Sequence, residues 1–390
     1  MPTPACLSIF LSRLLIASCL VIAPSVGARD TATLIDLLQS ENVEMRRAAT
    51  NQLGEHGPDA VAAQPQLITA LGDEDVQVRA NAAWALGKIQ GQSDLAAHAL
   101  IAAFADADWT VRHNASLSII WRGPSMLPML DESLVAPNPL VRLYAAYARL
   151  QIAPQDPARV IPTLTALLSA EQTEVRHTSA QILGGIGPAA AATIPQLITL
   201  LEDNIPVVRQ QAIMALGAMG KAARRAIPQL IALVGPDQTS ATRIAAATTL
   251  AAINLDFEQW IPAVLTMFQP NRSESVQAGA VAALVNVGAP AVPYLIDVLG
   301  EADVGVLLFA TQALTQIGKA SALATPRLIA QLHHDNWQIR LATIEALGAI
   351  GQDSESVMQA LQSAKEDSEE VVQLSATLAL ERLTKGPAGP

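Results

Sequence analysis

Residues 64–90 read QPQLITALGDEDVQVRANAAWALGKIQ and contain one complete structural unit. Pro65 suits the first turn of a helix, because the N–H that proline lacks has no helical partner there. Apolar residues follow at helical spacing up to Gly-Asp-Glu-Asp at 72–75, which ends this helix and can cap the next. The second helix carries an apolar stripe formed by Val78, Ala82, Leu86 and Ile89. The stretch therefore predicts helix, short turn, helix, with no strand.

The centre of this unit, Val78-Arg79, recurs along the chain at steps of 30 to 34 residues. Clear copies stand at Val111-Arg112, Val141-Arg142, Val175-Arg176 and Val208-Arg209. Variants that keep the arginine stand at Arg46, Arg243 and Arg340, and the register continues without it at Val276, Val306 and Val372. A period of roughly 20 to 50 residues is typical of stacked repeats, in which each unit buries its apolar face on its neighbours. We call the arginine of each copy the anchor arginine.

Composition and charge agree with closely stacked helices and exclude one class of partner. The chain is 51% hydrophobic, with 3% aromatic and 15% charged residues. Much of the hydrophobic share is alanine, which closely packed helices need, so the total does not indicate a membrane protein. The net charge is −11 and no Lys/Arg cluster is present. Because nucleic-acid binding depends on basic surfaces, the sequence predicts no nucleic-acid partner.

The same text returns in later units with little change. Ile-Pro-Gln-Leu-Ile occupies 194–198 and 227–231, Thr-Pro-Arg-Leu-Ile occupies 325–329, and Ala-Leu-Gly-Ala occupies 215–218 and 346–349. These motifs resemble the HEAT repeat, and more closely its short bacterial form, which is also found in phycobilisome bilin lyases. The match covers roughly residues 33–384. It implies an all-α fold, a right-handed superhelical α-solenoid of about eleven HEAT-like helical hairpins over residues 29–384.

The resemblance also implies a ladder between neighbouring units. In HEAT repeats the aspartate of the turn between the helices pairs with the arginine of the second helix. The expected ladder comprises the aspartates Asp75, Asp108, Asp203 and Asp335 and the arginines Arg79, Arg112, Arg176, Arg209 and Arg340. A partly buried guanidinium needs a carboxylate and several acceptors, which such a ladder supplies. The alternative is an arginine row that binds phosphate or carboxylate ligands.

Residues 1–28 do not join the repeat. Arg13 precedes an apolar run over 14–22, and small residues end the segment at Ala28. This order predicts a secretory signal peptide that is cleaved after Ala28. The expected location is therefore periplasmic or extracellular, in a bacterium. A flexible tail is expected at 385–390.

Two alternatives keep the protein on a membrane. Residues 5–22 could act as an uncleaved anchor, and Cys19 lies in a sequence that resembles the lipobox of bacterial lipoproteins. Both cysteines, Cys6 and Cys19, belong to the segment before Ala28. Cleavage there would leave no cysteine for a disulfide, thiol catalysis or a thiolate metal site.

No motif indicates catalysis, a cofactor or a metal. Deoxyhypusine hydroxylase, a HEAT-like enzyme, binds iron through His-Glu pairs, and this chain contains no His-Glu dipeptide. Glycine clusters at 184–187, 217–220 and 318 follow predicted helices and not strands, so they indicate helix ends and not a phosphate site. The sequence therefore predicts a protein that is not an enzyme, with no catalytic, cofactor-binding or metal-binding residues.

Five of the eight Trp and Tyr residues lie between positions 84 and 147. Positions two, five and nine residues after an anchor arginine share one face of the second helix, away from its apolar stripe. In three consecutive units these positions hold Asn81, Trp84, Lys88, Asn114, Leu117, Trp121, Tyr144, Tyr147 and Gln151. Second helices line the concave surface of HEAT arrays, and interface cores favour Trp and Tyr. We predict that these nine residues, called the aromatic patch, bind a partner. The alternative is that the rings fill gaps between alanine-rich helices, as we expect for Trp109.

The predicted function is that of an exported scaffold, which binds a protein or peptide on its concave surface. One alternative is an enzyme or enzyme subunit of the bilin lyase-like class that cradles a prosthetic group. Another is a purely structural envelope protein. The last helix, over 374–383, is expected to present Glu381, Arg382 and Lys385 as a polar outer face, because such caps prevent solenoids from stacking end to end.

Overall fold

The computed structural model describes residues 30–89, 93–301, 303–351 and 353–385, and these form helices without a strand. The chain divides into two compact units, residues 1–189 (unit 1) and 190–390 (unit 2). The predicted signal peptide with its cleavage site, the lipidation site and residues 386–390 lie outside the described residues. Lys385, which we expected to begin the tail, is the last residue of the last helix.

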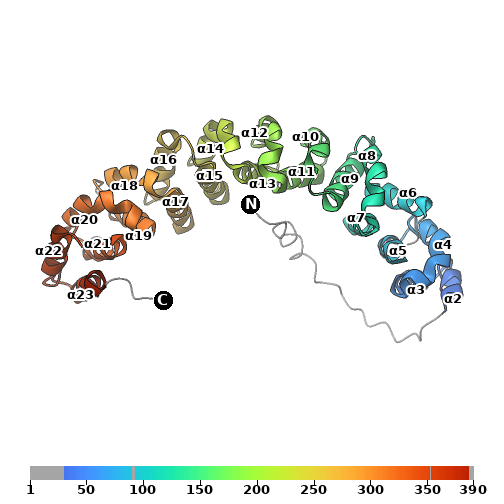
Figure 1. Ribbon diagram of the computed structural model, residues 1–390, viewed down its shortest axis with the longest axis horizontal. Helices are drawn as coiled ribbons and strands as arrows, with labels where there is room; N and C mark the ends of the chain where they lie inside the picture. Colours follow the sequence, from blue (N-terminus) through green and yellow to red (C-terminus); the bar gives the residue numbers. More distant parts are fainter. Residues whose placement is uncertain (1–29, 90–92, 302, 352, 386–390) are drawn as a thin grey trace. The chain divides into compact units, whose positions relative to one another are not determined.

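Each unit is a row of helical hairpins (Figure 1). Unit 1 contains α2 (Thr31–Leu37), α3 (Val43–His56), α4 (Gln64–Ala70), α5 (Val76–Ile89), α6 (Asp94–Ala102), α7 (Trp109–Arg122), α8 (Leu127–Ser133), α9 (Pro139–Ile152), α10 (Ile161–Leu167) and α11 (Thr173–Ile186). Unit 2 contains α12 (Ile194–Leu200), α13 (Pro206–Ala218), α14 (Ile227–Val234), α15 (Ser240–Ile253), α16 (Phe257–Leu265), α17 (Glu274–Val287), α18 (Val292–Val298), α19 (Val304–Ile317), α20 (Thr325–Gln331), α21 (Trp337–Ile350), α22 (Glu355–Ala364) and α23 (Glu370–Lys385). Pairing each even-numbered helix with the next gives eleven hairpins among the described residues. The predicted all-α solenoid is confirmed.

Local sequence sets the limits of these helices. Several second helices begin where a side chain accepts a backbone N–H, as Asp108 accepts that of Thr110 at 2.8 Å. Several end at a glycine with positive φ, for example Gly57 at 57° and Gly123 at 71°. Short 3-10 helices such as η7 (Gly220–Ala226), η9 (Ala289–Ala291) and η10 (Gly318–Ala324) then lead into the next hairpin.

The core lies between the first and second helices of each hairpin. The predicted stripe of α5 is fully or almost fully buried, at Val78, Ala82, Leu86 and Ile89. Alanines occupy many of the other buried positions, and their small side chains let second helices approach closely. One stretch among the described residues, Thr173–Leu200, has the length and apolar composition of a membrane span; buried core helices share these properties.

Arginines do form a ladder, but mostly with a different aspartate. Arg46 donates from Nε to Asp73 at 2.7 Å and from Nη2 at 3.0 Å. Arg79 binds Asp106 in the same two-pronged way, and Arg340 binds Asp367. In each case the aspartate follows the arginine by 27 residues and belongs to the turn of the next hairpin.

The prediction was therefore wrong for Asp75 and Asp108, each of which lies two residues after the carboxylate that completes the ladder. Asp75 caps α5 through the N–H of Val78 and pairs with Arg47, which is not an anchor arginine. Asp335 contributes its backbone carbonyl to Arg340, at 3.1 Å. Asp203 accepts the N–H of Ile205.

Anchor arginines also hold their own turns. Arg79 Nη1 donates to the carbonyls of Asp73 and Glu74, and further anchors that donate to a carbonyl of their own turn are Arg46, Arg112, Arg142, Arg176, Arg209 and Arg340. At two of the three positions where the register loses its arginine, a glutamine amide replaces it, and at the third the residue is Leu307. Gln277 donates to Phe268 and Gln269, and Gln373 donates to Asp367. The positive charge is thus dispensable for holding the turn.

The ion pair between Arg47 and Asp75 predicts a dependence of stability on pH. The Arg47 guanidinium lowers the pKa of Asp75 to about 2, against roughly 3.9 in an unfolded chain. A lowered carboxyl pKa stabilises the folded state above the unfolded pKa, and this contribution is lost as the pH falls through the folded one. We expect Asp75→Asn to lower the unfolding free energy by about 1 kcal/mol at pH 6. Urea unfolding should show this difference shrinking between about pH 4 and pH 2; a constant difference would contradict the assignment.

Candidate protein-binding surface

The second helices of unit 1 lie side by side in one layer. Packing joins α3 to α5, α5 to α7, α7 to α9 and α9 to α11. Figure 1 shows this layer on the opposite side of unit 1 from α4, α6 and α8. The predicted patch therefore lies on three helices that the fold places next to one another.

Trp84, Lys88 and Trp121 form one cluster. The ammonium of Lys88 lies 5.8 Å from the ring centre of Trp84 and 5.5 Å from that of Trp121, which is within the range of cation–π attraction. The Trp84 ring packs against Gly54 of α3, where a Cβ would collide with it. Trp84 is half-buried for this reason, whereas Trp121 is 43% exposed and Lys88 is exposed. The cluster brings together residues of α5 and α7 that lie 33 residues apart.

Tyr144 belongs to a second cluster. The Arg112 guanidinium lies 5.5 Å from its ring centre, and its hydroxyl donates to Glu174 at 3.3 Å. Arg112 Nη2 also binds both oxygens of Glu174, at 2.5 and 2.6 Å. These contacts join α7, α9 and α11, and sequence reasoning missed the role of Glu174.

Asn81 and Asn114 serve the fold. The Asn114 amide donates to the carbonyl of Ala80 at 2.9 Å, and the Asn81 amide donates to that of Arg47 at 3.3 Å. Each bond ties one second helix to the preceding one. Their amides are therefore engaged within the solenoid, and we remove both residues from the set that contacts a partner.

The other patch residues are accessible. Leu117 and Tyr147 are half-buried and Gln151 is exposed, and burial raises the pKa of the Tyr147 hydroxyl. Trp109, which we expected in the core, is 51% exposed. It is the first residue of α7, and its ring lies 6.1 Å from that of His113. Trp109 therefore adds an exposed ring at the end of α7 opposite to Trp121.

The charged side chains of α5, α7 and α9 are all basic. No acidic residue occurs in α5, α7 or α9, which carry the basic residues Arg79, Lys88, Arg112, Arg122, Arg142 and Arg149. The whole protein has a net charge of −11. The absence of acidic residues could have been read from the sequence once the three helices were known to be neighbours. Only Lys88 of these six is exposed, and Arg79, Arg112 and Arg149 are ion-paired within the solenoid, so the surface offers aromatic rings and one exposed ammonium.

Comparison with known families agrees with this architecture. A family model described as HEAT repeats matches residues 31–120, 161–251, 227–315 and 292–381, which together make up more than half of the chain. The chain belongs to the HEAT repeat family. This bears out the resemblance drawn from the repeated motifs.

Among solved structures, the HEAT repeat protein is similar to Kap121p, with 16% identity and a TM-score of 0.51 over 91% of this chain and 45% of that one. It is also similar to Kap121p bound to Nup53p, with 15% identity and a TM-score of 0.50 over the same shares. A structure of Kap95p with RanGDP shares 16% identity and a TM-score of 0.52, over 90% of this chain and 56% of that one. The chain spans about half the length of these proteins, and identities this low show the fold alone. No curated protein matches its sequence.

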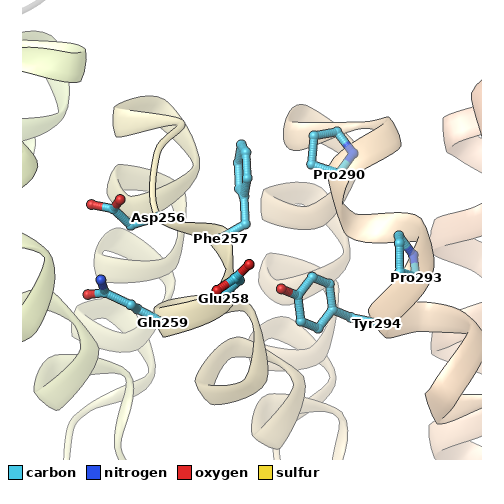
Figure 2. Close-up of a pocket in the computed structure, with 7 residues that line it drawn as sticks. All are labelled: Asp256, Phe257, Glu258, Gln259, Pro290, Pro293 and Tyr294. Atoms are coloured by element: carbon cyan, nitrogen blue, oxygen red, sulfur yellow. The ribbon is translucent and has the colours of Figure 1, made fainter.

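A surface groove of about 520 Å³ lies in unit 2 of the HEAT repeat protein (Figure 2). Phe257 and Glu258 of α16 line one side, and Pro290, Pro293 and Tyr294 of η9 and α18 line the other. The linker before α16 has positive φ at Asp256, whose carboxylate accepts both Nε and Nη2 of Arg224, at 2.5 and 2.6 Å. This ion pair holds the linker before α16 in its left-handed conformation, so the carboxylate of Asp256 has a structural role. In the described part of the chain, no group of three or more His, Cys, Asp or Glu residues could hold a metal ion.

Proposed function

We propose that this HEAT repeat protein is an exported scaffold that binds a protein segment on the aromatic patch, without catalysis. The observation that supports this is the cluster of Trp84, Lys88 and Trp121 on two helices that contain no acidic residue. Accessible indole rings around a cation offer apolar area and one charge, which is the composition of interface hot spots. HEAT-repeat solenoids are typically used for protein binding.

The charge of the surface defines the partner's chemistry. Trp121 and Trp109 expose apolar area at the two ends of α7, and Lys88 adds a positive charge beside one of them. A segment with aromatic or aliphatic side chains and a nearby carboxylate fits this arrangement, because the carboxylate would meet the Lys88 ammonium. Basic segments would meet like charges.

Solved solenoids of similar fold bind other proteins, which supports the proposed kind of partner. Kap121p has been solved bound to Nup53p and to Pho4p, and Kap95p with RanGDP. The proposal for this chain rests on its own aromatic patch and on residues 1–28, which carry the pattern of an export signal.

Site-specific photocrosslinking tests the proposal. A photoreactive phenylalanine analogue is placed at position 121, and the chain is recovered from the cell envelope after irradiation. We expect one protein to crosslink at this position, through a segment rich in acidic and apolar residues. The crosslinked HEAT repeat chain should have the mass of residues 29–390. The matched control places the same group at Trp337, which is equally exposed and begins the second helix of another hairpin, as Trp109 does.

Two variants then locate the binding energy. Trp121→Ala combined with Lys88→Glu should weaken binding of the identified partner at least about hundredfold, because hot-spot residues at an interface cost 2 kcal/mol or more each. Trp84→Ala with Tyr147→Ala should weaken it as well, and the helical circular dichroism signal should persist. Equal crosslinking at 121 and 337, or unchanged affinity in both variants, would refute the patch as the binding site.

A further inference from the structure

The last helix of unit 2, α23, leaves a row of side chains uncovered. Leu374 is 60% exposed and Leu378 is 54% exposed, and Val371 lies beside them. Glu370 and Arg382, both exposed, continue the row at the same four-residue spacing. The row therefore reads Glu, Leu, Leu, Arg along one face of the helix. Glu381 and Arg382 are exposed as expected for a polar outer face, but α23 also exposes these leucines, which the sequence analysis did not anticipate.

Leu374 occupies a repeat position that another hairpin uses for packing between second helices. Leu374 follows the anchor position by one residue, as Ile244 does in α15. The side chain of Ile244 lies against Gly279 of the next second helix, where a Cβ would come within 2.8 Å of it. The same position on α23 thus has the character of a helix–helix contact surface.

The charges at the two ends of the row favour a second copy of α23 as the partner of this surface. If two copies of α23 pack antiparallel about the midpoint of residue 376, Leu374 of each copy faces Leu378 of the other. Glu370 then faces Arg382 of the second copy, twice by symmetry. Each charged pair lies about 9 Å along the helix from the midpoint, at 1.5 Å per residue. A parallel pairing would instead place like charges together.

We propose that α23 is the interface of a twofold-symmetric dimer of this chain, formed by the antiparallel α23 pair. A self-complementary surface is what such symmetry requires, since one patch must match itself. Paired leucines supply the apolar centre, and the two Glu370–Arg382 pairs set the direction and register. The interface lies within unit 2 and does not involve the aromatic patch.

Sedimentation of the purified protein over a range of concentrations tests the dimer. We expect a dimer for the wild type, and Leu374→Glu or Leu378→Glu should raise its dissociation constant at least about hundredfold by burying charge among apolar groups. Leu323→Glu is the matched control, because Leu323 is 74% exposed on η10, away from α23. It should leave the dimer intact, and all variants should keep the wild-type helical circular dichroism signal, which shows that they are folded.

A charge swap tests the register. Glu370→Arg and Arg382→Glu should each weaken the dimer about tenfold or more by placing like charges opposite one another, and the double variant should restore it. A monomer at every concentration, a dimer insensitive to Leu374→Glu, or a double swap without rescue would overturn the proposal. Assemblies that keep growing with concentration would also overturn it, since they indicate head-to-tail stacking.

Discussion

Gly87→Ala is expected to lower the unfolding free energy of unit 1 by roughly 2–3 kcal/mol. Gly87 lies in α5 where α7 crosses it, and a Cβ added there would come within 2.7 Å of Ser118 Cβ and 2.9 Å of Ser118 Cα. Part of this obstacle is backbone, so the helices must separate. Such a separation would also strain the bond from the Ser118 hydroxyl to the carbonyl of Ala83. Urea unfolding followed by circular dichroism measures the loss.

Gly348→Ala is the matched control for this prediction. Gly348 stands eight residues after its anchor arginine, as Gly87 does, but a Cβ there would meet only ordinary contacts, 3.5 Å from Ala379 Cβ. Alanine in a helix interior is favoured over glycine by about 1 kcal/mol, so this variant should be neutral or stabilised. Equal effects at the two positions would contradict the close approach of α5 and α7. Ser118→Gly should partly rescue Gly87→Ala.

Arg112→Ala is expected to destabilise unit 1 by about 2–4 kcal/mol. Its guanidinium is almost fully buried, donates to the carbonyls of Asp106 and Ala107, and binds Glu174. Removal would leave these acceptors without their donor and would take away the support of the Tyr144 ring. Thermal and urea unfolding would measure the loss, and the tyrosine fluorescence of the native state should change with it.

Arg142→Ala measures how much of this loss of unfolding free energy comes from the hydrogen bonds to the turn alone. Arg142 occupies the same repeat position and donates to Ala136 and Pro137, but it is only half-buried. Its loss should cost about 1.5 kcal/mol, the lower end of the range for hydrogen bonds that involve a charged group, because Arg142 is partly open to solvent. If Arg142→Ala matched Arg112→Ala, the contacts with Glu174 and Tyr144 would contribute nothing to stability.

Most of the architecture was predictable because it follows from local rules. The period, the helix pairs and the buried stripe of α5 all depend on residues within one turn or one hairpin of each other, and helical periodicity sorts them by side. The exposure of Trp121 agrees with the same periodicity, whereas Trp84 and Tyr147, for which periodicity left both surface and core open, are half-buried. The aromatic patch could be anticipated for this reason. That its three helices, α5, α7 and α9, all lack acidic residues became meaningful only when they were known to be neighbours.

Contacts between hairpins were not predictable from spacing. Asp73 and Asp75 share one turn, and the packing of α3 against α5 decides that Arg46 takes the first and Arg47 the second. Arg112 finds no aspartate in the next turn, because the equivalent position, six residues before the next anchor, is Ala136, and it reaches Glu174 across 62 residues. Trp109 and Trp260 both lie in helices, yet one is exposed and the other fully buried. The sequence by itself determined the repeat and its hairpins, because those rest on short-range hydrogen bonds and periodicity. Only the tertiary structure decided the partners of its charges and the exposure of its rings, because these depend on how neighbouring helices are placed in space.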